Sequence, residues 1–184
     1  MKNCFKDLGI EPGLVLAEGA LQAAYDEGSR ERHPDAGGRP EAFQELTASY
    51  RELRHPGKRL AHWLDLQAGG FQKDGSLPGP VMALFGELGS LFAEIDAVLA
   101  KRREGRSALV QALTEREMLG LLPRLQEARS RIDKTTEDYV GTFADLEAAA
   151  RRGHFEEAQE TARALVFLEK WQGEARERWA RLAG

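Results

Sequence analysis

The sequence predicts an all-α protein, and three observations carry that prediction. Arginine, glutamate, alanine and leucine dominate the 184 residues, whereas valine and isoleucine are rare; the first four residue types favour helices. Apolar residues recur at spacings of three and four, which is the pattern of a helix with one buried face. No segment alternates apolar and polar residues as an exposed strand would. We therefore expect helices that pack on one another without a sheet.

Two helices are predicted before residue 34. A short helical turn at residues 5–9 precedes a longer helix at residues 17–32. The longer helix ends near His33, because Pro34 disfavours helical geometry in the residue before it. Its buried stripe consists of small and apolar side chains at helical spacing: Ala20, Leu21, Ala24, Tyr25 and Gly28.

Two further helices follow a turn in which Gly37 and Gly38 supply permissive backbone. The third helix covers residues 40–54, and Pro40 suits its first position. Its apolar stripe is Phe43, Leu46, Tyr50 and Leu53. Pro56 opens a fourth, short helix, because proline is tolerated at a helix start and not in its interior. The inward side chains of this helix are Leu60, Trp63 and Leu64.

A segment rich in glycine and proline divides the chain. Residues 67–80 hold four glycines and two prolines, which is typical of a boundary between domains. We expect an N-terminal domain over residues 1–70, a linker over residues 71–80 and a C-terminal domain over residues 81–184.

The sequence of the C-terminal domain predicts an antiparallel three-helix bundle, because its long amphipathic helices are joined by short links. Its first helix covers residues 81–104. Ser107 caps the next segment through its side-chain oxygen, and Pro123 breaks or kinks that segment. A long helix then covers residues 123–152, and the last helix covers residues 155–182. The last helix buries Ala158, Ala162, Leu165, Leu168, Trp171, Ala175 and Trp179.

Composition excludes several classes of protein. The net charge of −4 offers no basic excess for nucleic acid. Cys4 is the only cysteine, which excludes an internal disulfide and a zinc site with several thiolates. The four histidines lie far apart, and no phosphate loop, dinucleotide motif or nucleophile elbow occurs. We therefore expect a protein that is not an enzyme and that needs no metal and no cofactor.

The sequence also lacks membrane and secretion signals. No stretch reaches the roughly 20 apolar residues that span a bilayer, and the first seven residues contain no apolar run of a secretory signal. We expect a cytoplasmic protein that does not bind membranes.

Three stretches of the sequence carry a family resemblance. His33-Pro34-Asp35 lies between the two predicted helices of a hairpin, and the first 70 residues resemble a J-domain. The stretch from Ala48 to Leu66, with Arg54-His55-Pro56-Gly57-Lys58-Arg59 at its centre, is similar to the HscB branch of J-domain proteins. Residues 153–170 resemble the final helix of that branch, so the resemblance covers nearly the whole chain.

The resemblance implies a co-chaperone for iron-sulfur cluster assembly. The J-domain would dock on a DnaK/HscA-type chaperone ATPase and stimulate its ATP hydrolysis. The bundle would hold an IscU-like scaffold protein and deliver it to that ATPase. The expected chaperone-binding residues are Tyr25, Arg30, Arg32, His33, Pro34, Asp35, Lys58 and Arg59. Asp35 would accept a charge-assisted pair from a partner arginine.

The resemblance places a client patch on the first and last helices of the bundle. Its expected residues are Met82, Phe85, Glu87, Glu94 and Phe167. Core packing is the competing interpretation for Met82, Phe85 and Phe167, and it is the preferred one for Phe85. Phe167 lies off the inward stripe of the last helix, so an exposed aromatic is expected there. Gly86, Gly89 and Ser90 depart from the family pattern, which leaves a diverged scaffold or a different client open.

The charge of the second helix also departs from the family, which usually carries a basic helix there. Residues 17–32 hold four acids and two bases, for a net charge of −2. Long-range attraction governs the association rate more than the docked pose. An alternative function is therefore a diverged J-like binding module that no longer stimulates a chaperone.

Overall fold

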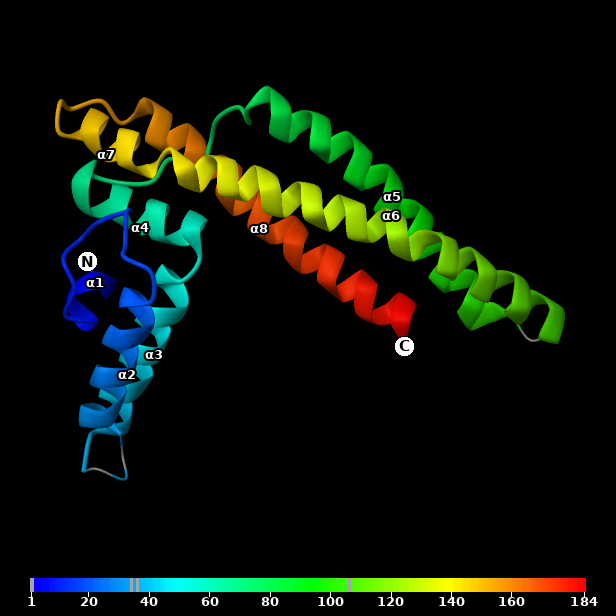
Figure 1. The fold of residues 1–184 in the computed structure, drawn as a ribbon, viewed down its shortest axis with the longest axis horizontal. Coiled ribbons are helices and arrows are strands. Elements are labelled where there is room, and N and C mark those ends of the chain that lie inside the picture. The colour runs from blue at the N-terminus through cyan, green and yellow to red at the C-terminus, as the bar shows by residue number, and fades with distance from the viewer. Residues whose placement is uncertain (1, 34, 36, 106) are drawn as a thin grey trace. The chain divides into compact units, whose positions relative to one another are not determined.

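The computed structural model describes residues 2–33, 35, 37–105 and 107–184, and its regular elements there are all helices. Their order can be followed in Figure 1: α1 (Cys4–Asp7), α2 (Ala20–Arg32), α3 (Pro40–Leu53), α4 (Pro56–Gln67), α5 (Gly79–Glu104), α6 (Ala108–Gly141), α7 (Phe143–Ala150) and α8 (Glu156–Ala183). The predicted all-α class is confirmed.

The chain folds into two compact units. The first unit contains Met1–Ser76 and Tyr139–Val166, and the second contains Leu77–Asp138 and Phe167–Gly184. Compact units need not be continuous in sequence. The division into an N-terminal domain, a linker and a C-terminal domain therefore stays a prediction.

The first unit contains a helical hairpin formed by α2 and α3. The rings of Tyr25 and Tyr50 stack between the two helices with centroids 4.4 Å apart. Gly28 lets α3 approach closely, since a Cβ there would lie 3.1 Å from the side chain of the fully buried Leu46. As predicted, α2 ends before His33, which has extended backbone (φ −64°, ψ 135°).

Within the same unit, α4 packs on the beginning of α8 through a glycine. A Cβ on Gly57 would lie 2.8 Å from the backbone nitrogen of Val166 and 2.9 Å from the carbonyl carbon of Leu165. Trp63 of α4 and Phe155, just before α8, also meet, with ring centroids 6.2 Å apart. The two backbones are therefore close enough that only glycine fits at position 57.

The substitution Gly57→Ala should destabilise the protein by about 1–3 kcal/mol, the usual effect of overpacking a tight contact. The reason is that backbone atoms, unlike the end of a flexible side chain, cannot rotate away. Gly173→Ala is the matched control, because open space surrounds position 173; it should stabilise α8 by up to about 1 kcal/mol through helix propensity. Urea unfolding of both variants checks this, and equal effects would contradict the close packing.

The second unit is the predicted antiparallel three-helix bundle. Three ion pairs join α5 to α6, and their residues are seven apart on each helix. The residue numbers rise along α5 as they fall along α6, which is the pattern of two antiparallel helices. These pairs are Glu87–Arg131, Glu94–Arg124 and Lys101–Glu117. Along α8, Gln172 donates to Asp133 of α6 (2.5 Å). Further on, Trp179 lies under Arg129, earlier in α6, so these helices are antiparallel too.

The prediction was wrong about where the long helices break. α6 continues through Pro123. Pro123 and Leu119, whose carbonyl lies one turn earlier, are both exposed, so water can satisfy the unpaired carbonyl. The helix expected over residues 123–152 instead ends at Gly141. There the Thr142 hydroxyl donates to the Tyr139 carbonyl (2.8 Å) and competes with the helical hydrogen bonds.

Candidate docking surfaces

The loop between α2 and α3 presents a carboxylate to solvent. The side chain of Asp35 is 92% exposed, and its backbone N–H donates to His33 Nδ1 (3.2 Å). Because Nδ1 accepts this hydrogen bond, the proton of a neutral His33 ring is on Nε2. The ring also lies edge-on to Phe43, with centroids 5.3 Å apart. His33 and Asp35 are thus brought together, whereas Pro34 lies outside the described residues.

Two glycines close this loop. The N–H of Gly38 donates to the His33 carbonyl (3.0 Å), and a Cβ on Gly38 would lie 2.2 Å from the Arg32 carbonyl oxygen. Gly37 has a φ of +83°, which glycine adopts without strain. Sequence reasoning identified permissive backbone here, yet the lack of room for a Cβ at position 38 is visible only in three dimensions.

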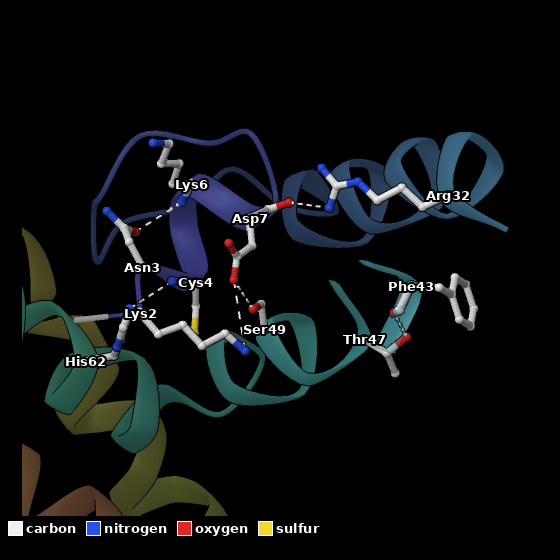
Figure 2. A network of polar contacts seen from close by, with 10 residues as sticks. All are labelled: Lys2, Asn3, Cys4, Lys6, Asp7, Arg32, Phe43, Thr47, Ser49 and His62. Carbon is white, nitrogen blue, oxygen red and sulfur yellow. Dashed lines mark hydrogen bonds and ion pairs between the residues drawn. The ribbon is translucent and has the colours of Figure 1, made fainter. Parts of the chain in front are cut away.

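Two of the four expected basic residues make contacts inside the fold. Arg32 donates to the carbonyl of Asp7 at the end of α1 (2.8 Å; Figure 2). Arg59 donates to the carbonyl of Leu53 at the end of α3 (3.4 Å) and lies 5.6 Å from the centroid of the Phe143 ring. Arginine at a helix C-terminus satisfies carbonyls that have no partner within the helix. Arg32 therefore joins α2 to α1, and Arg59 joins α4 to α3.

The other expected residues differ in accessibility. Arg30 is exposed in the last turn of α2. Lys58 is exposed and lies 3.8 Å from the Glu52 carboxylate, an exposed pair that contributes little stability. Tyr25 is half-buried, and its hydroxyl lies 3.4 Å from the Thr47 hydroxyl. Arg30 and Lys58 therefore remain accessible to a partner, while Tyr25 joins α2 to α3.

The surface of α2 is acidic, in agreement with its sequence. Asp26, Glu27 and Glu31 are exposed, and Asp26 accepts a hydrogen bond from the Gln22 side chain (2.8 Å). Arg32, one of the two bases of this helix, is held against α1. The exposed charged side chains of α2 are therefore three carboxylates and Arg30.

An aromatic cluster joins α5 and α8 in the second unit. Phe85 stacks on Trp171 (centroids 5.3 Å apart) and meets Phe167 edge-on (6.0 Å). The side chain of Phe85 is 46% exposed, so the core interpretation of this residue is wrong. Phe167 is half-buried, and Trp171, which sequence reasoning assigned only to the core, supports both rings.

The two acidic residues of the expected client patch lie elsewhere on α5. The Glu87 carboxylate accepts from Arg131, and Glu94 accepts from Arg124 (2.8 Å). These hydrogen bonds lower the pKa of both carboxyls. Position 87 is two residues from Phe85, hence about 200° around the helix. The expected patch is therefore split between two flanks of α5.

Small residues surround the exposed part of the aromatic cluster. Met82 is 50% exposed on the same helix, and a Cβ on Gly86 or Gly89 would meet open space. This part of α5 is a smooth, weakly charged surface beside two exposed apolar side chains. Exposed apolar groups of this kind are where partners bind.

The described part of the chain contains no candidate metal site and no candidate membrane-spanning helix. No three histidine, cysteine, aspartate or glutamate side chains there are placed to hold a metal ion. No helix described in the structure is both long and apolar enough to cross a bilayer.

A hairpin with short flanking helices, together with a bundle of long helices, defines an all-α, HscB-like fold. A solved structure with this fold is chaperone HscB from Vibrio cholerae: the TM-score is 0.57 and the sequence identity 19%, over 96% of this chain and 96% of that chain. No protein-family model and no curated protein matches the sequence. The likeness therefore concerns the fold.

Proposed function

We propose that this protein is an HscB-like co-chaperone that is not itself an enzyme. It docks on a DnaK/HscA-type ATPase through the His33–Asp35 loop, stimulates ATP hydrolysis, and delivers an IscU-like iron-sulfur scaffold protein. The observation that carries the proposal is the exposed Asp35 carboxylate, in a loop closed by hydrogen bonds at the end of a helical hairpin. The HscB-like fold supports it.

The chemistry of the loop suits docking. A carboxylate accepts two parallel hydrogen bonds from an arginine of the partner, which gives both strength and orientation. The hydrogen bonds of Asp35 and Gly38 to His33 hold these three residues together before binding. Residues that are already held in place lose less entropy when they dock.

The substitution Asp35→Asn should abolish stimulation of a DnaK/HscA-type ATPase by the full-length chain. Asparagine keeps the shape of the side chain but removes the charge that a partner arginine would bind. Steady-state ATP turnover with and without the protein measures the effect. The control is Asp145→Asn, a charge removal at an exposed position of α7, which should stimulate as the unaltered protein does. Undiminished stimulation by Asp35→Asn would refute the role of the loop.

A second experiment tests the client half of the proposal. Phe85→Ala should weaken binding of an IscU-like scaffold by about tenfold or more, the usual effect of removing an aromatic anchor. Glu94→Gln should leave the affinity unchanged. The Glu94 carboxylate lies on the flank of α5 away from Phe85, where it pairs with Arg124 of α6. Calorimetric titration of the scaffold measures both. A loss with Glu94→Gln alone would place the client on the α6 side.

The exposed acids of α2 favour one alternative, a J-like binding module that does not stimulate a chaperone. Most chaperone-docking helices attract an acidic partner face, and this helix would repel one. Capture of a scaffold without any effect on ATP turnover would support this alternative over the co-chaperone.

A further inference from the structure

The four-residue helix α1 is held in the first unit by side chains of three other helices (Figure 2). At its beginning, the N–H of Cys4 donates to His62 Nε2 on α4 (3.0 Å). At its end, the Asp7 carboxylate accepts from the Ser49 hydroxyl on α3 (2.6 Å), and the Asp7 carbonyl accepts from Arg32 on α2 (2.8 Å). A helix this short has little stability of its own, so these contacts hold it in place.

The contact at the beginning of α1 depends on the protonation of His62. Nε2 can accept the Cys4 N–H only while it carries a lone pair. The imidazole is half-buried and stacks on Phe5 with ring centroids 5.7 Å apart, so it cannot turn away without losing that packing. A proton on Nε2 would place two donors 3.0 Å apart and turn an attraction into a repulsion.

Charged groups from each neighbouring element face His62. Lys2 and Asp7 belong to the N-terminal segment, Glu52 to α3 and Asp65 to α4. Burial has the largest effect and lowers the pKa of His62 below its ordinary value of 6.5, and Lys2 acts in the same direction. The three carboxylates oppose this shift without reversing it. The folded protein therefore favours the neutral, accepting form of His62.

We propose that His62 is a proton-sensitive latch for α1: the neutral ring holds the beginning of the helix, and protonation releases it. Release of the beginning of α1 leaves the rest of the helix less firmly held, including the Asp7 carbonyl that accepts from Arg32, the residue before the His33–Asp35 loop. Acid therefore weakens the contact of α1 with Arg32 and, through Arg32, the support of the His33–Asp35 loop. The latch itself is independent of the proposed function; only its effect on chaperone docking depends on it.

The sign of the pH dependence follows from linkage. The unfolded chain takes up a proton on His62 at a higher pH than the folded protein does, so the stability from the latch is fully present above about pH 6.5. It is lost as the pH falls through and below that value. Neutral and mildly alkaline solutions should therefore hold the beginning of α1 against His62, and mildly acidic ones should release that end of the helix.

The test is hydrogen exchange at the Cys4 amide of the full-length protein, expressed as a protection factor, between about pH 7.5 and pH 5. Protection should be lost as the His62 ring titrates in NMR spectra of the same protein. In His62→Gln, an amide oxygen accepts at every pH, so protection should not depend on pH. His154→Gln removes an exposed histidine and should keep the pH dependence of the unaltered protein.

Two results would overturn the latch: protection of Cys4 that persists after the His62 ring has titrated, or the same pH dependence in His62→Gln. The ring titration of the unaltered protein decides the matter even where the variant folds poorly. Failure of the proposed function is a separate result, because it would appear as no stimulation of ATP turnover at any pH, whatever the Cys4 amide does.

Discussion

Alanine at position 38 should abolish stimulation of a DnaK/HscA-type ATPase while the helices of the protein stay folded. The added Cβ would lie 2.2 Å from the carbonyl oxygen of Arg32 and 2.4 Å from its carbonyl carbon. Both are backbone atoms at the end of a helix, so the loop has to open. Opening breaks the hydrogen bond from Gly38 to His33 and removes the ordered geometry that presents Asp35.

Steady-state ATP turnover measures the loss, and far-UV circular dichroism shows whether the helices remain. The substitution changes none of the residues proposed to contact the chaperone, so it separates loop geometry from loop chemistry. Gly120→Ala is the control, because open space surrounds that position in α6. Full stimulation by Gly38→Ala would mean that docking does not need this loop conformation.

Local rules predicted most helix boundaries, because most of them depend on one or two residues. A proline fixes the end of α2, and another starts α4, and neither depends on distant contacts. The break between α6 and α7 is different. Thr142 redirects a single hydrogen bond toward Tyr139, and the only local breaker is Gly141, an isolated glycine of the kind that helices often tolerate. Pro123 does not end α6, because its surroundings are exposed and water can satisfy the carbonyl that the proline leaves unpaired.

Two features of the candidate sites were not predicted from the sequence: the separation of the client patch and the partners of two arginines. Glu87 and Phe85 are close in sequence, and the resemblance joined them in one patch. The rotation of a helix places them on different flanks, which the period of 3.6 residues already implies. The partners of Arg32 and Arg59 are carbonyls of other helices. Such contacts arise from tertiary packing, which leaves no local pattern in the sequence.

The substitution Phe5→Ala should destabilise the protein by about 3–5 kcal/mol, a large part of the 5–15 kcal/mol that holds a typical domain folded. Phe5 is completely buried although it belongs to a helix of only four residues. The side chain therefore fastens α1 to the rest of the first unit, and it also supports the ring of His62. Urea unfolding followed by circular dichroism measures the loss.

Phe85→Ala removes the same atoms from an exposed site and is the control. Phe85 is 46% exposed, and its ring contacts Phe167 and Trp171. Such aromatic contacts are worth about 0.5–1.5 kcal/mol, so its effect should be several-fold smaller. Equal losses would mean that α1 is not anchored by Phe5. A large loss at Phe5 alone would show that the shortest helix depends on one buried ring, the ring against which His62 is held.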